Sequence, residues 1–253
     1  MRSNQRNGAA VSVVDRVSRL LAAYPPDQAE LSLAQLTRRS GLPKSTVHRL
    51  LVELESVGFV ERHDGRTRLG MRLFELGQLV PRQRTLRETA RPFMEDLREA
   101  TRQTVHLAVL DGLEVVYVEI LHTSQQPALQ SRVGGRMPTY CTGVGKVLLA
   151  HAAPATVAAV VAGGLTRRTP YTITSPEVLY RQLEEVRRTG TAHDHEEAGL
   201  NFACTASPVR GPDGRVVAAL SATGRLPMLQ TERIAPAVRT AALALSRALG
   251  GTA

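Results

Sequence analysis

Valines and leucines near the start of the chain recur with the three- and four-residue spacing of amphipathic helices. They give an apolar face to a first helix over 13–21, which two consecutive prolines end. Ser32 and Gln35 form the capping-box pattern of a second helix. A glycine turn over 40–42 then leads into a third helix over 43–56, with proline at its first position. Three helices with a short turn between the second and third predict a helix-turn-helix unit.

The third helix has an apolar face and a polar face. Its i, i+3, i+4, i+7 spacing turns four residues inward, Val47, Leu50, Leu51 and Leu54. The outward face and its flanks then carry Lys44, Ser45, Thr46, His48, Arg49 and Val52. Four cations and no acid stand between residues 31 and 52, so no carboxylate opposes the approach of a phosphate backbone. We interpret this helix as a recognition helix; the alternative is a solvated face in another three-helix module.

Two short β-like segments follow the third helix. They cover 58–63 and 66–69, and Asp64 with Gly65 joins them, a pair that favours the type I′ turn of a hairpin. A basic hairpin directly after a helix-turn-helix predicts a wing that lies along the DNA backbone or in the minor groove.

Side-chain chemistry assigns the expected DNA contacts. The expected base contacts come from Ser45, Thr46, His48 and Arg49, with guanine the target of Arg49. The expected phosphate contacts come from Arg38, Lys44, Arg62, Arg66 and Arg68.

Beyond the hairpin, the pattern predicts a linker helix and a second domain. The linker segment is apolar at Met71, Leu73, Phe74, Leu76 and Val80. This is more apolar surface than one small domain needs, so we expect the linker to pack against a second protomer. The expected organisation is a disordered basic tail over 1–10, a winged helix-turn-helix over 11–70, a linker helix and dimer contact over 71–84, and a second domain over 85–253.

The second domain alternates helix-like and strand-like segments. A helix with Ala90, Phe93, Met94, Leu97 and Ala100 inward precedes strands over 105–110 and 114–121, and a last helix over 232–249 is expected to cover one face of the sheet. Local hairpins followed by helices and more strands predict an α+β fold rich in antiparallel pairing. The uncharged stretch 147–166 is interrupted by proline, so we expect two short buried helices and no membrane span.

Composition and charge narrow the classes of function. The chain has 253 residues, 43% of them hydrophobic, and a net charge of +9 that favours a polyanionic partner. All cations but Lys44 and Lys146 are arginines, which suits phosphate and base contacts and equally fits a GC-rich genome. Two cysteines are too few for a disulfide framework, and no signal peptide is apparent, so the reducing cytoplasm is the expected compartment.

The winged helix-turn-helix of the IclR family of bacterial transcriptional regulators resembles one segment of the chain, RSGLPKSTVHRLLVELESVGFVERHDGRTRLGMRLFELG. That family's effector-binding domain resembles three later segments, GGRMPTYCTGVGKVLLAH, GTAHDHEEAGLNFACTASPV and DGRVVAALSATG. The resemblance extends over residues 11–249 in matching order. It implies a homodimer, often paired into a tetramer, that binds a double-stranded DNA operator through its N-terminal domain. It also implies that a GAF-like α/β domain binds a small-molecule effector.

A glycine-rich turn over 142–147 superficially resembles a phosphate-binding loop. The motif requires glycine five residues before its Gly-Lys pair and Ser or Thr after it, whereas Tyr140 and Val147 stand there. The turn can still present backbone N–H groups to a carboxylate at the start of a helix. The resemblance implies that Gly143, Val144 and Gly145 line the effector pocket; the alternative is that the glycines only permit close packing.

Titratable residues gather in the segment HDHEE at 193–197. With Cys204 nearby, His193 and His195 suggest a transition-metal-responsive regulator, while a solvated acidic edge is a plainer alternative. A cysteine-dependent enzyme that recruits His193 and Asp194 is a further alternative, although no hydrolase elbow, zincin or dinucleotide motif occurs. The resemblance implies instead that the cavity lining includes Asp194, Phe202, Cys204 and Ser221.

These observations together predict a transcription factor that responds to a small molecule, most simply an organic acid. Few cations stand near the pocket segments, so an anionic effector would depend on backbone donors or on Arg132 and Arg136. We expect no enzymatic activity, cofactor or resident metal. Ligand binding would act through the 71–84 linker, because a ligand shifts an equilibrium only between states that it binds unequally.

Overall fold

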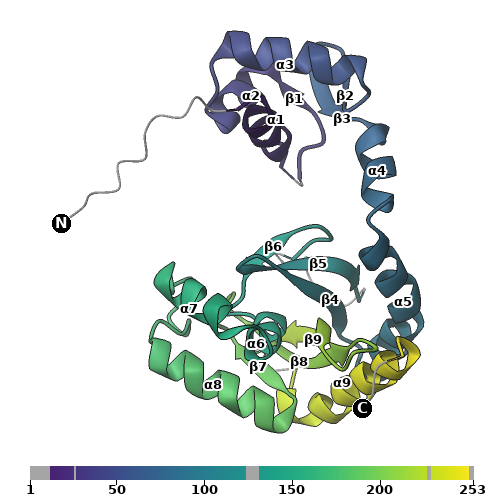
Figure 1. The fold of residues 1–253 in the computed structure, drawn as a ribbon, viewed down its shortest axis with the longest axis vertical. Coiled ribbons are helices and arrows are strands. Elements are labelled where there is room, and N and C mark those ends of the chain that lie inside the picture. Colours follow the sequence, from purple (N-terminus) through teal and green to yellow (C-terminus); the bar gives the residue numbers. More distant parts are fainter. Residues whose placement is uncertain (1–11, 26, 124–130, 227–228, 251–253) are drawn as a thin grey trace, which may run out of the picture. The chain divides into compact units, whose positions relative to one another are not determined.

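The computed structural model describes residues 12–25, 27–123, 131–226 and 229–250, without the side chains of 81–84. The tail expected to be disordered, 1–10, lies outside these residues. The chain divides into two compact units, Met1–Pro81 and Arg82–Ala253. Figure 1 labels the elements of both units.

The first unit is a three-helix winged helix-turn-helix. Its helices are α1 (Val13–Ala22), α2 (Leu33–Ser40) and α3 (Lys44–Ser56). Its strands are β1 (Leu31–Ser32), β2 (Val60–His63) and β3 (Arg66–Leu69), which form an antiparallel sheet in the order β1-β3-β2. The short strand β1, which the sequence analysis does not predict, ties the start of α2 to the hairpin.

Local signals place the ends of these elements. The capping box is present: Ser32 Oγ accepts from the Gln35 N–H at 3.3 Å, and Gln35 Oε1 accepts from the Ser32 N–H at 2.9 Å. Gly41 ends α2 with φ of +69°. Pro43 caps α3 instead of forming its first residue, because its ψ of 141° is extended. The hairpin turn is type I′, with positive φ at both Asp64 and Gly65.

The linker differs from the expected single helix over 71–84. It contains α4 (Met71–Gln78) and the start of α5 (Pro81–Thr101). Pro81 explains the break, because a proline disfavours helical geometry in the residue before it and is well suited to begin a helix.

The second unit is built on one antiparallel sheet of six strands in the order β6-β5-β4-β9-β8-β7. The strands are β4 (Thr104–Asp111), β5 (Glu114–Leu121), β6 (Arg136–Pro138), β7 (Ala192–His195), β8 (Phe202–Arg210) and β9 (Val216–Arg225). The helices besides α5 are α6 (Gly143–Ala150), α7 (Pro154–Ala162), α8 (Pro176–Thr189) and α9 (Thr231–Ala248). The α+β prediction, with its antiparallel sheet, is confirmed.

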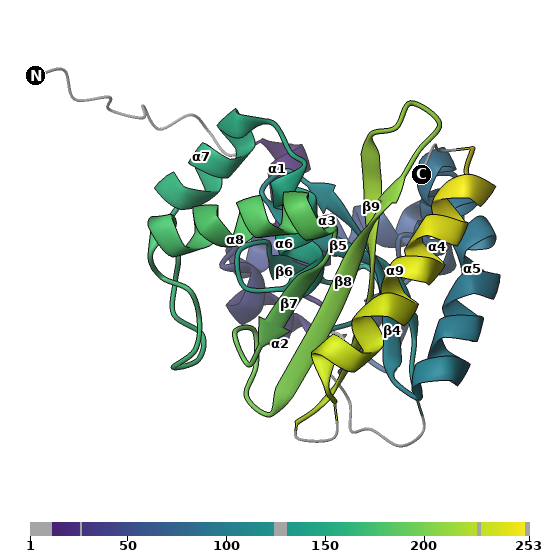
Figure 2. The same cartoon turned by 90° about the horizontal axis from the view of Figure 1, so that it is seen from below.

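Helices cover both faces of this sheet. Figure 2 shows α5 and α9 on one side and α6, α7 and α8 on the other. Two apolar cores result, one under α5 and α9 and one under α6 and α8. Ala100, expected to face inward on α5, is exposed.

The uncharged stretch after residue 146 forms the end of α6 and the separate helix α7. Every residue of α6 is buried, whereas α7 buries Val157 and Val160. Within the described ranges, no helix combines the length and apolar character needed to cross a membrane.

Candidate DNA-binding and effector-binding sites

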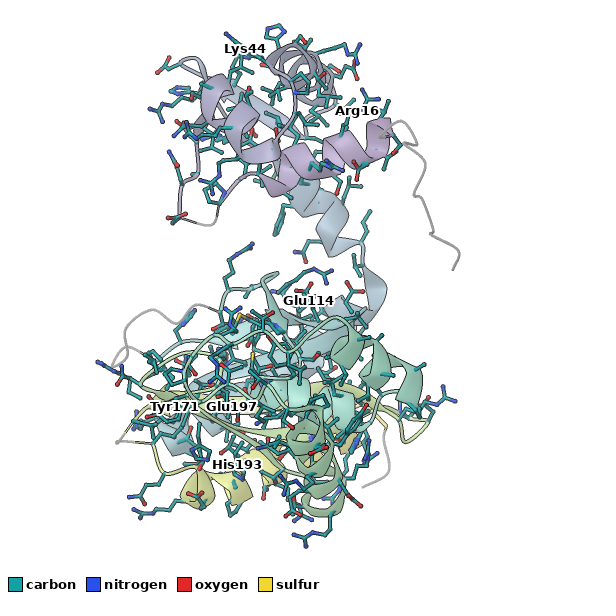
Figure 3. The ribbon with its side chains drawn as sticks, turned by 90° about the vertical axis from the view of Figure 1, so that its left-hand side faces the viewer. Arg16, Lys44, Glu114, Tyr171, His193 and Glu197 are labelled. Atoms are coloured by element: carbon teal, nitrogen blue, oxygen red, sulfur yellow. The ribbon has the colours of Figure 1, made fainter. Side chains whose placement is uncertain are left out.

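The polar face of α3 is open. Its inward residues Val47, Leu50, Leu51 and Leu54 are all buried in the core of the first unit. Its outward residues Lys44, Ser45, His48 and Arg49 are exposed, and Thr46 is half-buried. Lys44 lies at the surface of this unit in Figure 3. The orientation predicted from the spacing is therefore confirmed, and it presents hydroxyl, imidazole and cationic groups together.

The cations of this unit differ in how far they are already paired. Arg62 pairs with Glu55 at 3.1 Å, and Arg68 pairs with Glu61 at 2.7 Å. Arg38, Lys44 and Arg66 make no ion pair within the part of the chain that the structure describes. Arg49 lies 4.0 Å from Glu53, and both side chains are more than half exposed. Such a contact is weak, so the Arg49 guanidinium remains available.

A cavity of about 230 Å³ lies in the second unit beside the start of α6. Six of the seven residues expected in an effector pocket line it, namely Gly143, Val144, Asp194, Phe202, Cys204 and Ser221. Gly145 does not line it. A Cβ on Gly145 would lie 2.2 Å from the Thr139 carbonyl oxygen, so at this position glycine serves close packing.

The first turn of α6 directs free backbone donors at the cavity. Thr142 Oγ1 accepts a hydrogen bond from the Gly145 N–H at 3.2 Å and caps the helix. The N–H groups of Gly143 and Val144 have no acceptor among the described residues, and both residues line the cavity. Such a helix start favours an anion, as the sequence analysis expects.

Asp194 is the acid of the cavity lining. It is 7% exposed, and its Oδ1 accepts from the Glu197 N–H at 2.8 Å. Burial, reinforced by the nearby charge of Glu197, raises the pKa of Asp194 to about 7, although Lys146 and two backbone hydrogen bonds oppose this rise. The carboxyl can therefore hold a proton near neutral pH and act as a donor.

A buried ion pair supports the cavity from behind. Lys146 Nζ on α6 lies 2.6 Å from Glu197 Oε1 and 2.7 Å from Gln182 Oε1. Figure 3 shows Glu197 inside the second unit. The pair joins α6 to the segment after β7, and this segment supplies Ala198 and Leu200 to the cavity wall. This pair was not predicted from the sequence, where its one signal is a lone lysine in an otherwise apolar helix.

The histidines of β7 lie on the opposite face of the sheet from the cavity. Asp194 stands opposite Cys204 in the β7–β8 ladder, so these two share the cavity face. His193 stands opposite Thr205 and contacts its hydroxyl at 3.1 Å, and His195 Nε2 lies 3.4 Å from Thr231 Oγ1. A metal site made of His193, His195 and Cys204 is therefore wrong. Among the described residues, no group of three or more His, Cys, Asp or Glu side chains could hold a metal.

The cysteines and the two candidate arginines do not supply reactive or charged groups to the cavity. Burial raises the pKa of Cys141 to about 12 and of Cys204 to about 11, so neither is a ready nucleophile. Arg136 forms ion pairs with Asp111 and Glu114 at the edge of the sheet. Arg132 is exposed and does not line the cavity. A bound anion therefore depends on neutral donors.

The remaining polar wall comes from residues that the sequence analysis did not identify. They are His106, Tyr117, Ser131, Thr142 and Thr223. His106 Nε2 lies 2.8 Å from Ser131 Oγ, and its Nδ1 lies 3.4 Å from Thr223 Oγ1. Burial lowers the pKa of His106 to about 3, with His122 adding to the effect, so the imidazole is neutral. A polar residue inside a strand of otherwise apolar residues was the available signal.

Two family models match the chain. The "Bacterial transcriptional regulator IclR C-terminal" model covers residues 78–247, and the "IclR helix-turn-helix domain" model covers 13–64. The chain is similar to the HTH-type transcriptional regulator XynR of Escherichia coli, with 36% identity over 95% of this chain and 98% of the relative. It is also similar to the regulator KdgR of Escherichia coli, with 34% identity over 95% of this chain and 94% of the relative.

A solved structure is similar over the same extent. An IclR homolog from Microbacterium hydrocarbonoxydans, complexed with 4-hydroxybenzoate, has 36% identity and a TM-score of 0.87. The similarity covers 94% of this chain and 99% of the homolog.

Proposed function

Because this chain belongs to the IclR family of bacterial transcriptional regulators, we propose specific roles for its residues in DNA binding and effector binding. The protein is a DNA-binding transcriptional regulator that responds to a small-molecule effector. The single observation that carries the residue-level proposal is the open polar face of α3, whose leucines are all buried on the opposite side.

The recognition helix α3 enters the major groove. Arg49 contacts guanine, and the neighbouring edges are read by Ser45, Thr46 and His48. Phosphates are held by Arg38, Lys44 and the wing arginines Arg62, Arg66 and Arg68. Arg66 has no ion pair within the described residues, so it reaches DNA without breaking a contact, whereas Arg62 and Arg68 must share or exchange their glutamates.

Substitution of the two types of arginine tests these roles. Arg49→Ala should lose about 1–3 kcal/mol of discrimination at one base pair. Arg66→Ala should weaken binding to all sequences alike and lower the salt dependence by about one phosphate contact. Both variants are compared with wild type by gel shift on an operator series that varies one base pair at a time. An unchanged base preference in Arg49→Ala would remove Arg49 from the recognition set.

We propose that the effector is a small organic acid bound in the cavity of the second unit. The cavity offers free N–H groups at Gly143 and Val144, a protonatable Asp194, and apolar contacts from Phe202 and Met137. No Lys or Arg of the described chain lines it, which suits one carboxylate better than several. The homolog complexed with 4-hydroxybenzoate supports a small aromatic acid as the effector.

A thermal-shift screen of small monocarboxylic acids, dicarboxylic acids and divalent metals tests the effector class. We expect monocarboxylic acids to raise the Tm, since a ligand that binds only the folded state stabilises it. Each hit is then added to a gel shift with DNA from upstream of the protein's own gene. A response to metals alone would contradict the organic-acid proposal.

We further propose that the protein acts as a dimer or tetramer in the cytoplasm, where its DNA target lies, and without catalysis. The exposed apolar residues of α4 support self-association, with Met71 63% and Phe74 62% exposed. Analytical ultracentrifugation of the wild-type protein distinguishes two chains from four. The raised pKa values of both cysteines argue against a cysteine nucleophile.

A further inference from the structure

The Tyr117 hydroxyl of the second unit has no hydrogen-bond partner among the described residues. Tyr117 on β5 is 6% exposed and lines the cavity, yet its Oη makes no hydrogen bond within the part of the chain that is described. The other buried tyrosine of this unit differs, because Tyr140 Oη donates to the Thr166 carbonyl oxygen at 2.7 Å. Buried tyrosine hydroxyls usually find a partner. The Tyr117 hydroxyl is therefore available to a molecule in the cavity.

The pairing of β4 with β5 explains how Tyr117 reaches the cavity. Tyr117 stands opposite Ala108, and Ala108 stands opposite Ala219 on β9, so small side chains leave room for the aromatic ring. The ladder then shifts: Leu107 pairs with Glu119, which leaves one extra residue in β5.

This β-bulge decides which β5 side chain faces the cavity. After the extra residue, Glu119 points to the α5 side of the sheet, where its carboxylate pairs with Arg87 at 3.1 Å. With a regular ladder, Glu119 would share the face of Tyr117 and place a second carboxylate at the cavity. The bulge therefore leaves the wall with a hydroxyl and without that negative charge.

A neutral histidine holds the tyrosine ring. The His106 ring lies 5.2 Å from the Tyr117 ring, centroid to centroid, at an interplanar angle of 51°. His106 is itself held by Ser131 at 2.8 Å and Thr223 at 3.4 Å. Since its pKa is lowered to about 3, it adds no charge and acts as a positioning residue.

The electrostatics keep the Tyr117 hydroxyl protonated. Burial, with further contributions from Cys204, Asp194 and Cys141, raises its pKa far above the usual value of 10.0. The group is therefore a permanent hydrogen-bond donor. Tyr117 also lines the same cavity as Asp194, Cys204 and the first residues of α6.

We propose that the Tyr117 hydroxyl donates a hydrogen bond to the effector's carboxylate, alongside the backbone N–H groups of Gly143 and Val144. This inference rests on the proposed function, since it names the donor set for the acid in the same cavity. The chemical class that fits is a monocarboxylic acid whose remaining part is uncharged, because the Tyr117 hydroxyl and the two backbone N–H groups are neutral donors. A second anionic group would find no cation among the described lining residues.

The test compares two tyrosine-to-phenylalanine variants of the full chain. Affinities for 4-hydroxybenzoate and benzoate are measured by isothermal titration calorimetry for wild type, Tyr117→Phe and Tyr140→Phe. Tyr117→Phe should weaken both acids about tenfold or more, because it removes a hydrogen bond to a charged group. Its Tm without ligand should not fall, because no protein partner is lost. Tyr140→Phe should lower the Tm and leave the affinities unchanged.

Each remaining outcome overturns a different statement. If Tyr117→Phe binds both acids as tightly as wild type, the donor role is wrong and the effector class stands. If only 4-hydroxybenzoate loses affinity, Tyr117 contacts the phenol and the carboxylate assignment is wrong. If wild type binds neither acid, the proposed effector class fails together with this inference.

Discussion

Replacing Lys146 by methionine should destabilise the second unit by about 3–5 kcal/mol. The magnitude follows from burial: Lys146 is 0% exposed and Glu197 is 6% exposed, and their charged atoms lie 2.6 Å apart. Methionine keeps most of the side-chain volume but leaves the Glu197 carboxylate buried without its cation. Glu197 Oε2 has no partner among the described residues even in wild type, so that oxygen offers no compensation. The pKa of Asp194 should also rise further, because Lys146 now lowers it.

A second substitution separates lost charge from lost packing. Lys146→Met combined with Glu197→Gln removes both charges and should recover most of the stability, to within about 2 kcal/mol of wild type. The Gln182 carboxamide can turn to donate to the new amide, so the polar atoms remain satisfied.

Urea unfolding followed by circular dichroism measures these free energies. The chain provides a matched control in Lys44, its other lysine, which is exposed on α3. Lys44→Met should change the free energy of unfolding by less than about 0.5 kcal/mol. The reasoning is refuted if Lys146→Met costs no more than Lys44→Met, or if the double variant is as unstable as the single one.

Three further predictions concern pH, helix capping and association. The pKa of Asp194 is raised from 3.8 to about 7, so the stability that its protonated form contributes is complete below pH 3.8 and lost as pH rises through 7. Asp194→Asn should flatten the fall of Tm between those values, an effect of up to about 4 kcal/mol, and parallel Tm profiles would contradict it. Ser32→Ala should cost the first unit about 1 kcal/mol by removing the capping box, measured by urea unfolding against the exposed Ser18→Ala; equal effects would refute the capping role. Phe74→Glu should dissociate the oligomer by placing a charge on the apolar surface of α4, and an unchanged mass in analytical ultracentrifugation would exclude that surface as the contact.

The helix-turn-helix was predictable because its signals are local. The capping box at Ser32, the glycine at 41 and the leucine spacing of α3 each act within a few residues. The Asp64-Gly65 turn is equally local, since its positive φ values depend on its own two residues. The strand β1 was missed because two residues form a strand only when β3 lies beside them.

The sequence predicted the cavity residues on β8 but not those on β4 and β5. Phe202 and Cys204 alternate along β8, so their shared face follows from strand periodicity. Tyr117 and His106 lie 85 to 98 residues earlier in the chain, on β5 and β4. A β-bulge that no local signal marks determines which β5 residues face the cavity. The metal hypothesis was wrong because the pairing of β7 with β8 places Cys204 on the opposite face of the sheet from His193 and His195.

The sequence by itself determined most of the elements of both units, the outward face of α3 and the α6 turn, because these depend on interactions between residues close along the chain. Only the tertiary structure decided which polar groups meet. Lys146 pairs with Glu197 across 51 residues, and Tyr117, Asp194 and Cys204 line one cavity. Burial then determined the protonation states of these groups, because removal from water raises the free energy of the charged form. The spacing of residues along the sequence does not show how deeply each group is buried.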